Sequence, residues 1–108
     1  MELASVLPSL TEYVKRQSGD FPDSLEKIIV FGSYARGEAK VGSDIDIALV
    51  SNGTWSIPDR GAVRDVLDDF APELRLGLFY TTNEGLLAED DRNTNYWIRN
   101  EGVELWRR

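Results

Sequence analysis

Apolar residues recur at helical spacing in two stretches of the chain. In the first stretch they lie at Leu3, Val6, Leu7, Leu10 and Val14. This spacing predicts an amphipathic helix. Pro8 fits a helix only within its first turn, so the regular helix is expected to begin near Leu7. Residues 59–70 repeat the pattern and predict a second helix, with apolar positions at Val63, Val66, Leu67 and Phe70.

Shorter apolar runs, bounded by turn-forming residues, predict strands. We expect these strands over residues 27–31, 44–50, 74–82 and 103–106. Three short helices are expected between them, over residues 34–38, 83–90 and 96–100. The order α-β-α-β-α-β-α-α-β predicts an α/β (α+β) fold in which helices pack on one mixed sheet. The chain has 108 residues, the length of one small domain, so a single domain over residues 1–108 is expected.

The net charge and the absence of two residue types narrow the chemistry. The formal net charge of −7 argues against a nucleic-acid-binding surface, which needs clustered Lys and Arg. Without Cys or His, the chain has neither thiolate ligands nor the commonest general base. Catalysis would therefore rest on carboxylates, hydroxyls, basic side chains or a bound hard metal ion. No apolar run approaches the roughly 20 residues of a membrane span and no signal peptide is visible, so no membrane contact and a cytoplasmic location are expected.

The first candidate functional element is the turn after the first predicted strand, at Gly32-Ser33. Gly lets the backbone approach a ligand closely. If a helix follows over residues 34–38, its first N–H groups lack partners and lie at the positive end of the helix dipole. Such a turn binds phosphate, and the Ser33 hydroxyl adds a donor. Arg36, one turn further on, reaches a phosphate or pairs with a carboxylate. Taken alone, the turn is more typical of an ordinary strand-to-helix connection.

The second candidate element is the pair Asp44 and Asp46 on the next predicted strand. Because side chains alternate along a strand, both carboxylates point to one face while Ile45 and Ile47 point into the core. Two like charges roughly 7 Å apart repel each other, and a bound cation would reverse that cost. Mg²⁺ fits best, since it uses few protein carboxylates and keeps places for water and substrate phosphates. Ser43 is expected to shape the preceding turn.

Together the two elements resemble a known family. Gly32-Ser33, ten further residues and then Asp44-x-Asp46 resemble the GS-x10-DxD signature of the DNA polymerase β superfamily. The finer pattern, GSYARG over residues 32–37 and SDID over residues 43–46, resembles its minimal nucleotidyltransferase (MNT) branch. Residues 99–106 are similar to the closing strand of that branch. The resemblance covers about residues 25–107.

The resemblance implies a polymerase β-like nucleotidyltransferase fold and Mg²⁺-dependent transfer of a nucleoside monophosphate from an NTP to a hydroxyl group. Members that act as antitoxins add AMP from ATP to a tyrosine of a small helical ribonuclease, a HEPN-type toxin; others modify small molecules. The expected partners are therefore an NTP, with ATP favoured, and either a HEPN-type helical protein or a second copy of the chain. The family pattern assigns nucleotide binding to Gly32, Ser33, Arg36 and Ser43, and metal binding and catalysis to Asp44 and Asp46.

One position departs from the family pattern. The third carboxylate of the family lies on the third strand, and matching residues 76–82 to the usual V-D-L-V-V-Y-T places Gly77 where that Asp belongs. Glu73 shares this face but lies about 13 Å along the strand, too far to substitute. Arg75 also shares it and is placed to pair with Asp44 or Asp46. Two interpretations stay open: a nucleotidyltransferase with impaired activity, and a catalytically inactive nucleotide-binding or protein-binding module that docks to a helical partner.

The tryptophans are expected to serve packing. Trp55 lies in a polar loop and is expected to cover the edge of the core, with base stacking and partner contact as alternatives. Trp97 and Trp106 are expected to be core or interface anchors and not ligand contacts.

Overall fold

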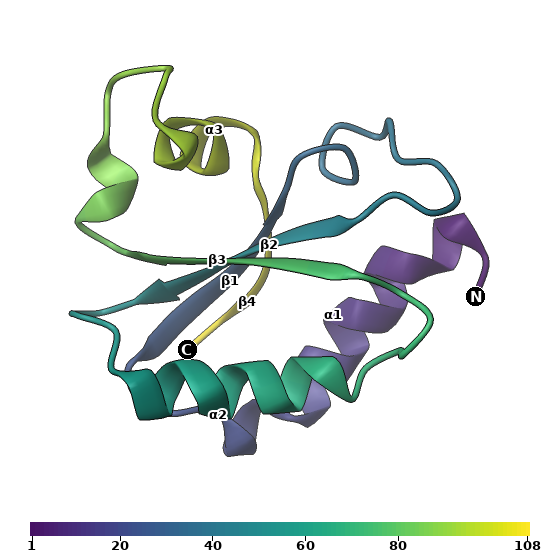
Figure 1. Ribbon diagram of the computed structural model, residues 1–108, viewed down its shortest axis with the longest axis horizontal. Helices are drawn as coiled ribbons and strands as arrows, with labels where there is room; N and C mark the ends of the chain where they lie inside the picture. The colour runs from purple at the N-terminus through teal and green to yellow at the C-terminus, as the bar shows by residue number, and fades with distance from the viewer.

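Four strands form one mixed sheet in the computed structural model, which describes residues 1–108 (Figure 1). The strands are β1 (Leu25–Phe31), β2 (Ile45–Ser51), β3 (Leu76–Thr82) and β4 (Val103–Arg107), in the spatial order β3-β2-β1-β4. β1 pairs antiparallel with both β2 and β4, whereas β2 and β3 are parallel. The parallel pair needs a crossover, which α2 (Ile57–Asp68) supplies.

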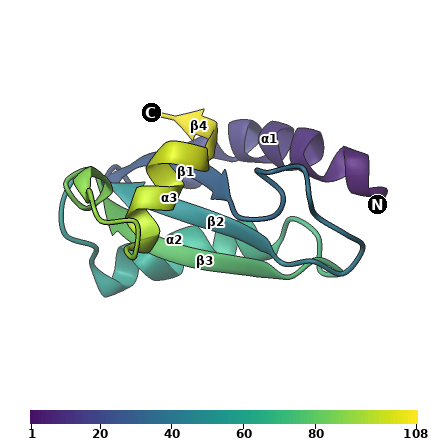
Figure 2. The same ribbon diagram turned by 90° about the horizontal axis from the view of Figure 1, so that it is seen from above.

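Helices cover both faces of this sheet. α1 (Val6–Arg16) packs with α2 on one face, while α3 (Thr94–Glu101) and the short 3₁₀ helix Gly85–Leu87 pack on the other. Figure 2 shows α3 in front of the strands and α2 behind them. Two further 3₁₀ helices, Leu3–Ser5 and Ser18–Asp20, flank α1. None of these helices combines the length and the apolar character needed to cross a membrane.

Alternation along β2 divides the interior into two unequal cores. Ile45, Ile47 and Leu49 point toward α1 and α2 and join a cluster of 15 buried residues. Ala48 and Val50 point to the opposite face and join a cluster of only five buried residues. Asp46 lies between Ile45 and Ile47, so its side chain points to the α3 face. This face of the sheet, the less deeply packed one, carries the site.

The expected fold class is confirmed, with element bounds that shift by a few residues. α1 begins at Val6, with Pro8 in its first turn. α2 begins at Ile57, two residues before the predicted start, because the Ser56 side chain accepts a hydrogen bond from the backbone N–H of Asp59 and caps the helix. The helix expected over residues 83–90 is reduced to one 3₁₀ turn, Gly85–Leu87.

The helix expected over residues 34–38 does not form, and this prediction was wrong. The backbone makes a single turn, in which Arg36 N–H donates to the Gly32 carbonyl at 3.1 Å. The turn then closes: Glu38 N–H donates to the Ser33 carbonyl, and Gly37 N–H donates to the Tyr34 carbonyl. These two bonds are the pattern of a Schellman helix terminus, with Gly37 at φ +72°. The glycine at position 37 therefore closes the chain after a single turn, before a helix can form.

Two of the tryptophans lie where packing predicts. Trp55 is buried, and its indole N–H donates to the Leu49 and Thr81 carbonyls. This contact confirms Trp55 as a cover for the core. Trp106 is partly buried, with its ring 5.3 Å from that of Phe21 in an edge-to-face pair.

Candidate active site

The turn after β1 brings the backbone against a carboxylate on β2. Gly32 has φ +72°, a conformation that other residues avoid. A Cβ at this position would lie 2.2 Å from Oδ2 of Asp46. Glycine is therefore required here for two independent reasons: the backbone conformation and the space taken by Asp46.

A second glycine lies on the other side of the same carboxylate. Asp46 is paired in register with Phe31 on β1 and with Gly77 on the parallel strand β3. A Cβ at Gly77 would lie 3.0 Å from Oδ1 of Asp46, which is a tight contact. Residue 77 is also the position that the family pattern assigns to the third carboxylate. Any side chain placed there would lie against Asp46.

The surroundings of Asp46 oppose its ionisation. Burial is the main effect that raises the pKa of the Asp46 carboxyl, and repulsion from the Asp44 carboxylate raises this pKa further. The Arg36 guanidinium acts in the opposite direction but does not cancel them. The site thus holds negative charge that the protein's own cations leave partly uncompensated.

Asp44 has a different environment, just outside the N-terminal end of β2. It is exposed, and its Oδ1 lies 3.0 Å from Nε of Arg75 in an ion pair with 80% of the Arg75 side chain in solvent. This contact confirms the expected pairing of Arg75 with one of the two aspartates. Because the pair is so exposed, it holds Asp44 only weakly.

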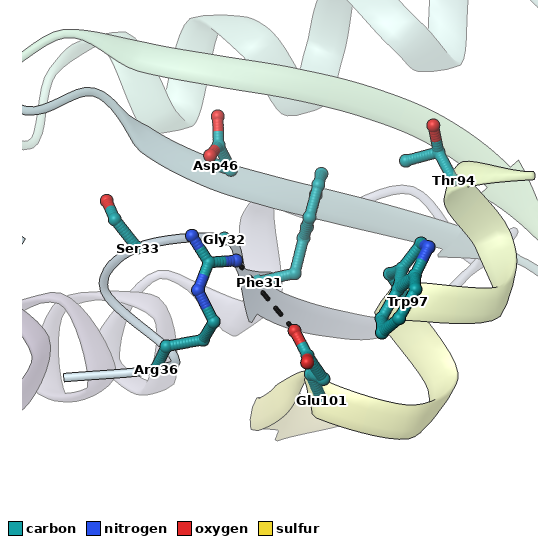
Figure 3. A pocket seen from close by; sticks show the side chains of 8 residues that line it. All are labelled: Phe31, Gly32, Ser33, Arg36, Asp46, Thr94, Trp97 and Glu101. Carbon is teal, nitrogen blue, oxygen red and sulfur yellow. Dashed lines mark ion pairs between the residues drawn. The ribbon is translucent and has the colours of Figure 1, made fainter. Parts of the chain in front are cut away.

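A pocket of about 640 Å³ collects four of the six residues that the sequence nominated, Gly32, Ser33, Arg36 and Asp46. Asp44 and Ser43 do not line it. The Ser43 hydroxyl instead accepts a hydrogen bond from the Lys40 N–H at 2.9 Å, which agrees with its expected role in shaping the turn. The remaining lining residues are Phe31 of β1 and Thr94, Trp97 and Glu101 of α3 (Figure 3).

Sequence analysis did not find the contribution of α3. Glu101 faces Arg36, with 3.8 Å between its Oε2 and Nη1 of Arg36, while Glu38 accepts a hydrogen bond from Arg36 Nε at 2.6 Å. Trp97, expected in a core or an interface and not at a ligand site, lines the pocket with 42% of its surface exposed. The expected core position of Trp97 was wrong, because no local pattern shows that the loop before α3 folds this helix back over the end of β1.

The carboxylates of the site suit a cation that is held partly by the protein and partly by a bound substrate. No group of three or more acidic side chains comes close enough together to hold a metal ion by itself. The N–H groups of Ser33, Tyr34 and Ala35 donate no hydrogen bond within the chain and lie at the turn that opens the pocket. The site therefore offers anion-binding donors beside a pair of carboxylates, which suits a phosphate ligand with its counter-cation.

The family model for the nucleotidyltransferase domain matches residues 7–99. The chain belongs to this family. The match includes the turn after β1, both aspartates and most of α3, so all of the pocket residues except Glu101 lie within the matched region.

Two relatives are candidate protein adenylyltransferases from Methanocaldococcus jannaschii. The first is 35% identical to this chain over 66 residues, which make up 56% of this chain and 43% of the relative. The second is 41% identical over 44 residues, 41% of this chain and 44% of the relative. The aligned part of this chain thus spans less than half the length of either relative.

Solved structures share the nucleotidyltransferase fold. A candidate nucleotidyltransferase from Sulfolobus solfataricus has a TM-score of 0.59 and 28% identity, with 94% of this chain and 80% of that chain covered. A toxin–antitoxin complex with AMP-PNP has a TM-score of 0.61 and 22% identity, with coverages of 94% and 73%. A complex of the tri-AMPylated HEPN toxin of Shewanella oneidensis with its MNT antitoxin has a TM-score of 0.58 and 19% identity, with the same coverages. At these identities the two toxin–antitoxin complexes show the fold alone.

Proposed function

We propose that this chain binds ATP with Mg²⁺ and transfers AMP to a hydroxyl group of a partner protein, at a rate limited by the missing third carboxylate. The observation that carries the proposal is the position of Asp46. Its carboxylate lies between Gly32 and Gly77 at the wall of a pocket that Ser33 also lines, and the N–H groups of the turn after Gly32 donate no hydrogen bond within the chain. A phosphate-binding turn beside a metal-binding carboxylate is the equipment of phosphoryl and nucleotidyl transfer.

Asp44 and Asp46 are the residues that would hold Mg²⁺. This ion binds through one or two carboxylates plus substrate phosphates, which matches a site with two aspartates and no cluster of three acidic groups that could hold a metal ion. When bound, Mg²⁺ would neutralise charge on the phosphates and align the attacking and leaving oxygens. We therefore expect Mg²⁺ to bind together with the nucleotide and only weakly without it.

The chain's own groups have separate tasks in this proposal. The N–H groups of Ser33 and its two successors, with the Ser33 hydroxyl, hold the triphosphate. Arg36 contributes the positive charge, exchanging part of its contact with Glu38 and Glu101 for a phosphate oxygen. In the transfer, the acceptor oxygen forms a bond to the α-phosphorus while the bond from that phosphorus to the bridging oxygen breaks and pyrophosphate leaves. These groups serve mainly to position the reactants.

The site lacks the family's base for the proton of the acceptor hydroxyl. In complete family members a carboxylate on the third strand is there to help activate this hydroxyl, and here Gly77 occupies the register position beside Asp46. In this proposal the proton leaves to solvent or to a base that the acceptor supplies, since the pocket's other carboxylate, Glu101, faces Arg36. General-base catalysis is worth about 10²- to 10⁴-fold in rate, so its loss would leave a slow enzyme.

Gly77 also supports a second candidate function, a module that binds nucleotide and partner but transfers nothing. The names of the relatives favour a protein acceptor, and the toxin–antitoxin complexes among the structural neighbours favour a small helical toxin as the partner. Both candidates share the nucleotide site and the partner. They differ only in whether AMP is transferred.

Thermal unfolding with Mg²⁺ and each NTP tests the shared part, with Asp46→Asn as the control. A ligand at about 100 times its dissociation constant should stabilise the native state by about 2.7 kcal/mol. A Mg²⁺-dependent rise in Tm that Asp46→Asn abolishes supports the site, and no rise with any nucleotide contradicts it. Mass spectrometry of a HEPN-type helical protein after incubation with ATP, Mg²⁺ and the chain then distinguishes transfer from docking. An AMP adduct supports the enzyme, whereas a stable complex without adduct supports the docking module.

A further inference from the structure

The pocket has two chemically different ends. Figure 3 shows Ser33, Arg36 and Asp46 gathered at one end and Thr94 and Trp97 at the other, with Phe31 between them. The first end offers hydroxyl, guanidinium and carboxylate groups. The second offers an indole ring, and Phe31 adds a second aromatic side chain to the lining. A ligand that fills the whole pocket therefore has a charged part and a flat apolar part.

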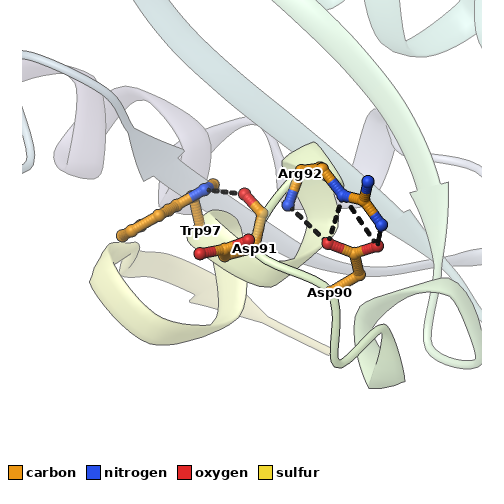
Figure 4. Close-up of polar contacts among 4 residues, drawn as sticks. All are labelled: Asp90, Asp91, Arg92 and Trp97. Carbon is orange, nitrogen blue, oxygen red and sulfur yellow. Dashed lines mark hydrogen bonds and ion pairs between the residues drawn. The ribbon is translucent and has the colours of Figure 1, made fainter.

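Trp97 is held in a fixed orientation although 42% of its surface is exposed. Its indole N–H donates to the carbonyl of Asp91 at 2.6 Å (Figure 4). The loop that carries this carbonyl is itself fixed, because the Arg92 backbone and side chain donate to the Asp90 carboxylate. The ring of Tyr96 meets the Trp97 ring edge to face, with 5.1 Å between their centroids. These contacts leave the indole with a part of its surface toward the pocket.

A tryptophan this exposed loses much of the stabilisation that burial would give it. The contacts that hold it are made at its N–H edge and with Tyr96, not by a core around it. A rigid, exposed indole is a suitable surface for stacking, since it loses little conformational entropy when a flat ring covers it. Phe31 is fixed in a similar way by an edge-to-face contact with Phe79, at 6.2 Å between the centroids.

We infer that Trp97 is the nucleobase-binding residue of the pocket, with the base stacked on its indole while the triphosphate lies at the turn after β1. This inference rests on the proposed nucleotide site and adds what binds at its far end. A nucleotide is the ligand class that joins a flat aromatic ring to a chain of phosphates. Stacking does not read base edges, so it favours the larger purines by contact area.

Binding of two probes by the full chain tests the inference: ATP and inorganic tripolyphosphate, each with Mg²⁺. The two share the phosphate chain, but only ATP has a base. Stacking on one aromatic side chain is worth about 1–3 kcal/mol by alanine substitution, so Trp97→Ala should weaken ATP binding by about 5- to 140-fold. It should leave tripolyphosphate binding unchanged, and Trp97→Phe should retain most of the ATP affinity. Leu87→Ala, which shortens another exposed apolar side chain outside the pocket, is the matched control and should change neither affinity.

The outcomes separate this inference from the proposed function. If Trp97→Ala binds ATP as tightly as the original chain, the inference is overturned while the nucleotide site stands. Equal affinity of the original chain for ATP and tripolyphosphate also overturns it, because the base would then contribute nothing. If the original chain binds neither probe, the proposed function fails and the inference falls with it. Should Trp97→Ala fold poorly, Trp97→Leu decides, because it keeps apolar bulk at position 97 without an aromatic ring: loss of the preference for ATP over tripolyphosphate supports stacking, and an unchanged preference overturns the inference.

Discussion

Gly77 on β3 lies in register with Asp46 on β2, so close that a Cβ added to Gly77 would stand 3.0 Å from Oδ1 of Asp46. The absence of a side chain at position 77 thus determines the space beside the candidate catalytic carboxylate. Restoring a carboxylate there is the most informative change that the chain allows.

Gly77→Asp is expected to raise the rate of AMP transfer at least tenfold, because it restores a base beside the acceptor site. Without Mg²⁺ it should lower the free energy of unfolding, since it adds a charge next to Asp46. Transfer is measured by mass spectrometry of the acceptor, and unfolding by urea titration. Gly77→Ala is the control: it brings the same Cβ contact without the carboxylate and should not increase transfer. A Gly77→Asp variant no faster than the original chain would show that the third carboxylate is not what limits the rate.

Gly32→Ala is expected to destabilise the fold more than Gly37→Ala. Both glycines have φ +72°, so each substitution costs roughly 1–2 kcal/mol for the backbone conformation. Only at position 32 does the new methyl also collide with Asp46, since nothing lies within 4 Å of a Cβ at position 37. Urea unfolding of the two variants measures the difference. Equal losses would mean that the Asp46 carboxylate moves away freely and is not fixed by its contact with Gly32.

Asp46→Asn is expected to stabilise the metal-free chain at pH 7. The pKa of Asp46 is raised in the folded state, first by burial and then by Asp44. The folded state then holds this proton more tightly than the unfolded state, so ionisation costs stability, and the cost disappears below the unfolded pKa of about 3.9. The gain should be less than about 1 kcal/mol, because the carboxylate is partly exposed, and should vanish near pH 3.5.

Urea unfolding in EDTA at pH 7, 5 and 3.5 measures this dependence. Asp65→Asn, which alters an exposed carboxylate on α2, is the control and should change stability little at any of the three pH values. A loss of stability in Asp46→Asn at pH 7 would contradict the prediction. It would mean that the ionised carboxylate accepts stabilising contacts that the amide cannot replace.

Arg75→Gln is expected to have a small effect, because the Arg75–Asp44 ion pair is exposed and such pairs contribute about 0–1 kcal/mol. Removing the guanidinium frees Asp44, so the Mg²⁺ concentration needed for half of the nucleotide-induced rise in Tm should fall by no more than about fivefold. Arg107→Gln removes another exposed, ion-paired arginine, which lies outside the pocket, and controls for net charge. A large fall with Arg75→Gln, absent in the control, would make Arg75 an effective competitor of the cation.

The sequence predicted what depends on local periodicity. Alternation along β2 correctly separated Ile45 and Ile47 from Asp46, because in a strand the face of each residue follows from its neighbours. The family alignment assigned the position of the third carboxylate to Gly77, and the structure adds that this residue lies in register with Asp46 on the neighbouring parallel strand.

The parts that were missed depend on backbone geometry and on distant contacts. The helix expected over residues 34–38 failed because Gly37 adopts the left-handed conformation that ends a helix, and a glycine in a sequence does not reveal which conformation it takes. The position of Trp97 depends on a hydrogen bond to Asp91 and on α3 folding back over β1. Neither contact has a signal in the residues near Trp97.

The larger hydrophobic core and the candidate site lie on opposite faces of the sheet. This arrangement separates the stability of the fold from the transfer activity, two properties that natural selection often has to balance. Substitutions among the pocket residues leave the 15-residue cluster under α1 and α2 untouched. A lineage that no longer needs transfer can therefore lose its carboxylates one at a time and still inherit a foldable chain. Within such a family, a shared fold indicates common ancestry, and only the residues around Asp46 indicate whether a given member is still an enzyme.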